Sequence, residues 1–179
     1  MNMKTNIPTL IGLLMAPLVV AVGVSGQAVS LADIGHDVYK SEADGFEVAL
    51  PHECVNVTPT AGGRIYTCDV KEGRVVIHPE AADPAVNTDA ELAAYLEGFR
   101  GTLNTADGVK ILSETPLHLG DYHGAAFQVT VNGGNVFMTT LCHGRTTITV
   151  TGQASPTVPN ATKLVGAAVQ SFAFTAKPK

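Results

Sequence analysis

Apolar and polar residues alternate along several short segments of the chain, as they do in β-strands with one buried face. The alternating segments are residues 45–51, 64–70, 74–78, 109–115, 125–131, 136–142 and 146–151. Turn residues flank one of the later segments: Asn132-Gly133 precedes residues 136–142, and His143-Gly144 follows them. Because Asn-Gly between alternating segments is a strong hairpin signal, we predict antiparallel pairing, with a further reversal of the chain at His143-Gly144.

Prolines set two of the expected strand ends. The stretch 79–87 contains Pro79 and Pro84 and is expected to interrupt the sheet, because proline cannot donate a backbone hydrogen bond. For the same reason, the strand that begins at Val109 is expected to end at Pro116.

Two segments have the periodicity of a helix that buries one face. The first has apolar residues at helical spacing: Leu92, Tyr95, Leu96, Phe99 and Leu103. Thr88 and Glu91 precede them at the spacing of a capping box, in which each side chain satisfies a free backbone N–H. The second segment has Ala161, Leu164, Val165, Ala168 and Phe172, with Thr157 or Asn160 as the expected N-cap.

The predicted order of elements is therefore β-β-β-α-β-β-β-β-α. Since the strands come in groups joined by hairpins, we expect an α+β fold, a mostly antiparallel sheet with two packing helices. The expected organisation is a single domain over residues 44–174, with a lead-in segment at 29–43 and a tail at 175–179.

The start of the chain has the layout of a secretory signal peptide. Lys4 is followed by an apolar run from Ile7 to Val24 and then by small residues at Gly26 and Ala28. We therefore predict a signal peptide over residues 1–28 and a location in the periplasm or outside the cell, free of the membrane after cleavage. The alternative is an uncleaved anchor, because the apolar run is just long enough to span a bilayer.

Composition narrows the function classes. The chain has 179 residues, with 11 Lys and Arg against 16 Asp and Glu, a formal charge of −5. An acidic chain without a basic cluster is not expected to bind nucleic acid, because it offers nothing to neutralise phosphates. An apolar content of 45% is enough for a packed core, so disorder is not expected.

An exported protein tends to pair its cysteines. Cys54 and Cys68 flank the turn-forming stretch 58–63, so they come opposite each other if the flanking segments pair as antiparallel strands. We predict this disulfide, with Cys142 as a small buried residue beside a turn. A pairing of Cys142 with Cys54 or Cys68 stays open at this point.

Histidines supply the candidate ligands and catalytic groups. His118, Asp121 and His123 fall within one short stretch and are weak candidates for a metal site, which needs three or four ligands; solvated turn residues are the alternative. Cys142-His143 would be a nucleophile and its base, but neighbours in a strand point to opposite faces, and no Gly-x-Ser-x-Gly elbow occurs. We therefore predict no catalytic residues and no cofactor.

Several segments together resemble the PsbP-like superfamily, including its DcrB-like bacterial periplasmic members. They are the opening DGFEVALP at residues 44–51, the single helix after three strands, the stretch 120–127 at the start of a long hairpin, and a last helix running into residues 171–174. The resemblance covers about residues 44–174 and implies a small αβα sandwich. It also implies an accessory, assembly or binding module, and it brings no catalytic residues.

We accordingly expect an exported, non-enzymatic accessory protein that binds another protein of the envelope or the secreted fraction. One alternative is a periplasmic protein that binds a metal ion or a small molecule. The other is an uncharacterised hydrolase.

Overall fold

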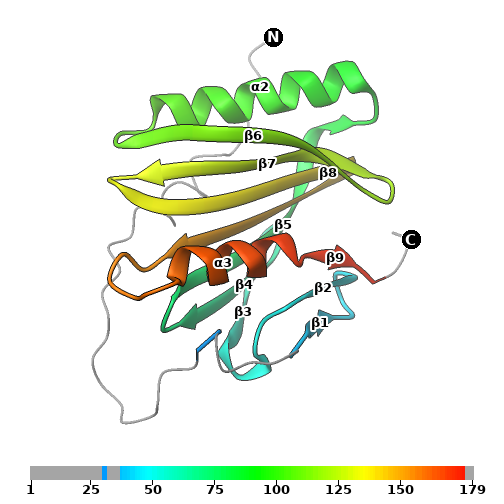
Figure 1. Cartoon of the computed structure of the whole chain (residues 1–179). Helices are drawn as coiled ribbons and strands as arrows, with labels where there is room; N and C mark the ends of the chain where they lie inside the picture. The colour runs from blue at the N-terminus through cyan, green and yellow to red at the C-terminus, as the bar shows by residue number, and fades with distance from the viewer. Residues whose placement is uncertain (1–29, 32–36, 176–179) are drawn as a thin grey trace.

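The computed structural model describes residues 30–31 and 37–175. Six strands form its main sheet, in the order β3-β4-β5-β8-β7-β6, and every pairing between them is antiparallel, as predicted (Figure 1). They are β3 (Val55–Thr60), β4 (Gly63–Val70), β5 (Gly73–Val86), β6 (Val109–Leu119), β7 (Tyr122–Val131) and β8 (Gly134–Ala154). A small second sheet has the order β1-β2-β9 and consists of β1 (Tyr39–Ser41), β2 (Phe46–Val48) and β9 (Ala173–Phe174).

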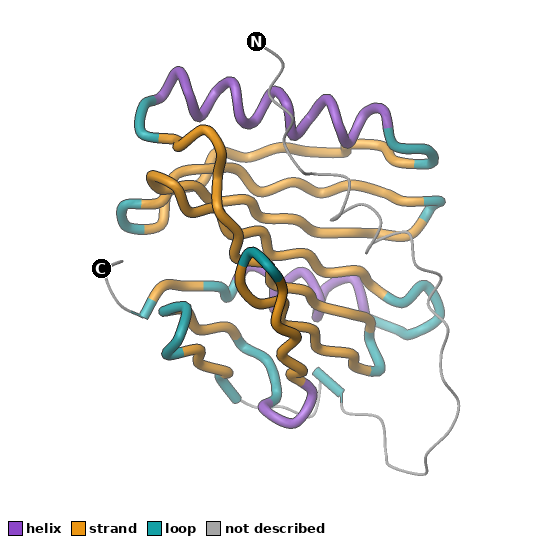
Figure 2. Tube along the Cα trace, turned by 180° about the vertical axis from the view of Figure 1, so that it is seen from behind, coloured by secondary structure: helices purple, strands orange, loops and turns teal. Residues whose placement is uncertain are grey.

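Two helices cover opposite faces of the main sheet, which gives three layers (Figures 1 and 2). Helix α2 (Asp89–Thr105) lies along β6 and β7, and helix α3 (Ala161–Gln170) lies over β8. Neighbouring residues of β8 show the two faces, because successive side chains of a strand point in opposite directions. Met138 packs in the buried cluster of α2, whereas the Phe137 ring lies against Gly166 of α3. The expected α+β sandwich is confirmed.

Strand β8 turns back on itself at His143-Gly144, as the sequence predicts (Figure 1). Its first part pairs with β7 as far as Cys142, and its second part pairs with β5 from Gly144 onward. A straight strand of 21 residues would be about 70 Å long. Helix α3, with 10 residues, is only about 15 Å long, yet it contacts Phe137 in the first part and Gly152 in the second. The two parts of β8 therefore lie side by side under α3.

The two strand ends expected at prolines are wrong. Strand β5 continues through Pro79 to Val86, and β6 runs through Pro116. Within the stretch 79–87 the interruption comes later than expected, because the β5–β8 register shifts between Ala81 and Val86, around Pro84. Both prolines stand where one side of the strand is unpaired: the ladder between β4 and β5 ends at Ile77, and β6 is the last strand of the sheet. A proline is compatible with a strand when its missing N–H faces an unpaired side.

The predicted start of α2 is confirmed. Thr88 Oγ1 accepts a hydrogen bond from the backbone N–H of Glu91 at 3.2 Å, and Glu91 Oε2 accepts one from the Thr88 N–H at 3.0 Å. Helix α3 begins after Asn160, one of the two expected N-caps, but the Asn160 side chain makes no capping hydrogen bond there. Its backbone is left-handed at that point, with φ of 62°.

The disulfide between Cys54 and Cys68 is confirmed, with the Sγ atoms 1.99 Å apart and the Cα atoms 4.8 Å apart. Cys54 ends the short 3₁₀ helix η1 (His52–Cys54), and the next residue, Val55, is the partner of Cys68 in the β3–β4 ladder. Both cysteines are buried in the cluster that also contains the inner residues of α3. Cys142 is the free cysteine, so the alternative pairings are wrong.

Structure begins earlier along the chain than expected, because β1 lies inside the segment 29–43 that was expected to be a lead-in. It pairs with β2, which in turn pairs with β9 near the other end of the domain. The predicted signal peptide at 1–28 and residues 176–179 of the expected tail lie outside the described residues. In the described part of the chain, no helix is both long enough and apolar enough to cross a membrane.

Candidate functional site

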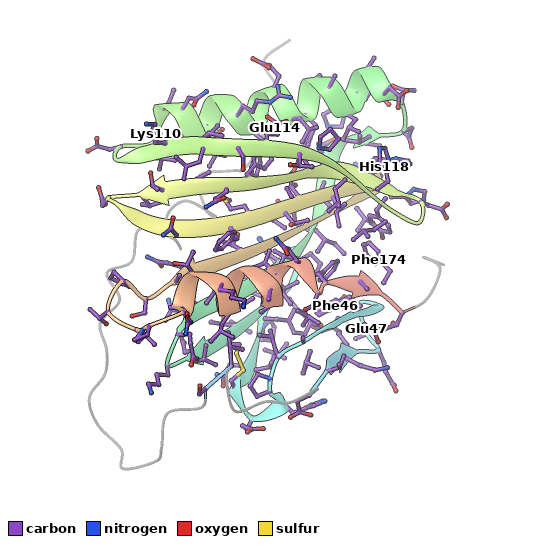
Figure 3. All side chains as sticks on the ribbon, viewed as in Figure 1. Phe46, Glu47, Lys110, Glu114, His118 and Phe174 are labelled. Atoms are coloured by element: carbon purple, nitrogen blue, oxygen red, sulfur yellow. A yellow bond between two sulfur atoms is a disulfide. The ribbon has the colours of Figure 1, made fainter. Side chains whose placement is uncertain are left out.

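Three connections meet at one end of the main sheet, which we name the turn end. They are the β6–β7 turn at Gly120-Asp121, the reversal of β8 at His143-Gly144, and the residues that lead from β5 into α2. A cavity of about 310 Å³ opens between them, and its lining includes Asn87, Asp89, Asp121, His123, Cys142 and His143. Figure 3 labels His118 at this end of β6. The fold thus gathers the histidines and the acidic residue that the sequence singles out.

His118 and His123 stand directly opposite each other in the β6–β7 ladder. Their Nδ1 atoms are 2.6 Å apart and their ring centroids 4.8 Å apart, and both residues are exposed. At this distance one imidazole donates its Nδ1–H to the lone pair of the other. The pair therefore holds one proton between two nitrogen atoms.

Asp121, the third predicted ligand, lies in the turn between the two histidines. Its backbone carbonyl oxygen accepts a hydrogen bond from His143 Nδ1 at 3.0 Å. Across residues 30–31 and 37–175, no group of three or more His, Cys, Asp or Glu side chains is placed to hold a metal ion. The structure thus brings His118 and His123 together but does not add Asp121 to them.

Sequence reasoning considered His143 only as a neighbour of Cys142 and missed its place beside the β6–β7 turn. Its ring centroid is 5.3 Å from that of Tyr122, which stacks on Phe174 with centroids 3.9 Å apart. The hairpin predicted at Asn132-Gly133 contained a signal for this position, because the register of β7 and β8 places Cys142 opposite His123. The residue after Cys142 must then lie next to the β6–β7 turn.

Cys142 does not have the properties of a catalytic nucleophile. Burial is the main reason that the pKa of its thiol is raised to about 12. A hydrogen bond with Tyr95 lowers this pKa, and the nearby Glu80 carboxylate raises it. A thiol with such a pKa stays protonated near neutral pH, whereas the thiolate is the reactive form. His143 is exposed and bonds to the turn. These two neighbours thus do not form a nucleophile–base pair.

The arrangement of layers is similar to that of a solved structure. The solution structure of cyanobacterial PsbP (CyanoP) from Synechocystis sp. PCC 6803 matches with a TM-score of 0.52 and 13% sequence identity, over 88% of this chain and 99% of that chain. The chain has a PsbP-like fold. The resemblance drawn from the sequence is therefore confirmed at the level of the fold.

A second solved structure with this fold is LpqN, described as involved in cell envelope biogenesis of Mycobacterium tuberculosis. It matches with a TM-score of 0.48 and 13% identity, over 84% of this chain and 100% of that chain. No model of a known protein family matches the chain, and no curated protein sequence matches it. The role of the turn end is therefore argued from the residues of this chain alone.

Proposed function

We propose that this protein is an exported, non-enzymatic accessory protein that binds another protein of the cell envelope or the secreted fraction through the turn end. The disulfide is the observation that supports export from the cytosol. Cys54 and Cys68 are bonded to each other inside the core, where they are 5% and 1% exposed. Structural disulfides form and persist in oxidising compartments and are rare in the cytosol. The signal-like sequence before Ala28 is consistent with the same compartment.

The turn end supports the binding half of the proposal. Four exposed side chains lie in or beside the turns at this end of the antiparallel sheet: His118 and His123 at the ends of β6 and β7, Asp121 in the turn between them, and His143 at the reversal of β8. Loops held by a rigid sheet are the usual place for recognition residues, because the scaffold fixes their positions. The Tyr122 ring contacts His143 and stacks on Phe174, which connects β9 to this surface.

Site-specific photocrosslinking tests this proposal. A photoreactive amino acid is placed at Asp121, in the turn end, and in a matched control at Lys163, an exposed residue of α3. Each full-length variant is expressed in the native host, and the envelope and medium are irradiated. We expect a discrete light-dependent adduct from position 121 and not from position 163. Equal adducts from both positions, or none from position 121, would contradict the proposal.

A second candidate function, binding of a metal ion, is favoured by the contact between His118 and His123. It uses side chains of the same end of the sheet, but it requires no partner protein.

A further inference from the structure

We propose that His118 and His123 together form a binding site for a divalent transition-metal ion, with Cu²⁺ bound most tightly. This site has two protein ligands, and it does not use the Asp121 carboxylate. It is independent of the proposed protein partner.

The backbone places the two imidazoles before any ion arrives. His118 and His123 are a cross-strand pair, so their side chains leave the same face of the sheet from neighbouring positions. The turn between them is tight and includes Gly120 at a φ of 61°, a left-handed conformation that suits glycine. On its other side, His123 pairs with Cys142 of β8, which holds β7 in the sheet. Ligands on paired strands are positioned more accurately than ligands on a loop.

The distance between the two rings fits an ion after a small movement. Zinc–imidazole bonds of about 2.0–2.1 Å imply nitrogen atoms about 2.9 Å apart at a right angle and about 3.3 Å apart at a tetrahedral angle. The Nδ1 atoms are now 2.6 Å apart, with a proton between them. Both side chains are exposed and can rotate outward by the few tenths of an ångström that are needed. The ion would then replace the shared proton.

The ligand type selects the class of ion. Imidazole nitrogen suits Cu, Ni and Zn, whereas Mg and Ca prefer oxygen ligands. For a given set of nitrogen ligands, affinity rises to a maximum at Cu²⁺, so Cu²⁺ is expected to bind more tightly than Ni²⁺ or Zn²⁺. The remaining coordination positions face solvent and are filled by water. The acidic chain, with a formal charge of −5 and with Asp89 and Asp121 beside the neighbouring cavity, attracts cations to this region.

Metal titration of the untagged, metal-free protein tests the site. Cu²⁺ and Mg²⁺ are titrated separately into the wild type and the variants His118→Ala and His123→Ala, with His52→Ala as a matched exposed histidine elsewhere in the fold. We expect one Cu²⁺ per chain in the wild type and in H52A, and no binding of Mg²⁺. Each pair variant should lose affinity by about tenfold or more, because one of two ligands is gone. Melting curves of the metal-free variants check that each is folded.

Electron paramagnetic resonance of bound Cu²⁺ gives a second readout. Wild-type protein should show coupling to two imidazole nitrogens, and each pair variant to one. Asp121→Ala should keep the wild-type spectrum and affinity. The proposal is overturned if the pair variants bind as tightly as the wild type, or if H52A or D121A loses as much affinity as they do. Absence of Cu²⁺ binding would also overturn it, and would leave the crosslinking result unaffected.

Discussion

Glu72 holds Leu31: the Glu72 Oε2 atom accepts a hydrogen bond from the Leu31 backbone N–H at 2.8 Å, and Oε1 accepts one from the Ser30 hydroxyl at 2.5 Å. Glu72 lies in the tight β4–β5 turn, where a side chain would ordinarily be exposed, yet this residue is only 2% exposed. Its own carbonyl accepts a hydrogen bond from the Ser155 N–H, beyond the end of β8. One turn thus links the residues just after the predicted cleavage point to the main sheet.

Replacing Glu72 with Gln should weaken this link in a pH-dependent way. Burial raises the pKa of Glu72, but the hydrogen bonds from Ser30, Leu31 and its own backbone, together with the nearby Lys71 charge, bring the pKa below its ordinary value. A carboxyl with a lowered pKa stabilises the fold above its unfolded pKa, and this contribution is lost as the pH falls through the folded pKa. We expect E72Q to lose about 1 kcal/mol of unfolding free energy near neutral pH, and less in acid.

Denaturant unfolding at neutral and acidic pH measures this difference. Glu53→Gln serves as the control, because Glu53 is exposed. If E72Q unfolds at the same denaturant concentration as the wild type near neutral pH, the turn does not hold the N-terminal residues as described.

Removal of the disulfide should cost a large share of the stability. The bond closes a loop between cysteines 14 residues apart in the sequence. In the chain-entropy model such a loop contributes about 3 kcal/mol. We expect the double variant Cys54→Ala/Cys68→Ala to lose about this much unfolding free energy and to become insensitive to reductant. Cys142→Ala is the matched control and should stay sensitive, whereas equal sensitivity of both proteins would refute the pairing.

Cys142 should be unreactive in the folded protein. Its side chain is in the α2 cluster, and burial raises the pKa of the thiol to about 12. Because thiol reagents react with the thiolate, we expect labelling near neutral pH to wait for unfolding. The rate is measured with a chromogenic disulfide reagent with and without denaturant. Rapid labelling of one thiol per native molecule would show that Cys142 is accessible.

Gly152 tests the packing of α3 on the sheet. A Cβ atom at this position would lie 2.6 Å from Val165 Cγ1 and 2.6 Å from Val169 Cγ2. Such a contact forces side chains or the helix to move, so Gly152→Ala should lose about 1–3 kcal/mol of unfolding free energy. Adding Val169→Ala removes one of the two clashes, so the cost of G152A should be smaller in that background. If the losses of unfolding free energy from G152A and V169A simply add in the double variant, the contact is contradicted.

Local sequence signals predicted much of this fold. Thr88 and Glu91 marked the start of α2, and Asn132-Gly133 marked the turn between β7 and β8. The spacing of Cys54 and Cys68 about their turn predicted the disulfide, although the register differs by one residue: Val55, not Cys54, lies opposite Cys68.

The predictions were wrong or incomplete where contacts with residues distant in the sequence determine the local structure. Pro79 and Pro116 are compatible with strands because no strand pairs beside them on one side, and a single sequence does not say which side is unpaired. Strand β1 has three residues, too few to show an alternation, and it exists because β2 pairs with it. The histidine cluster was only half predicted. His118 and His123 were expected together and are in contact. His143 was not expected there; it bonds to Asp121, between the two histidines, because the β7–β8 hairpin lies beside the β6–β7 hairpin.

Mass spectrometry of the protein recovered from its native host tests the central claim most directly. Cell envelope, medium and cytosol are separated, and peptides are mapped without reduction after free thiols are blocked in denaturant, which exposes Cys142. We expect the protein in the envelope or medium, with its N-terminus at Val29, a Cys54–Cys68 cross-linked peptide and a blocked Cys142. A chain recovered from the cytosol with its first residues intact and all of its cysteines blocked would contradict the account.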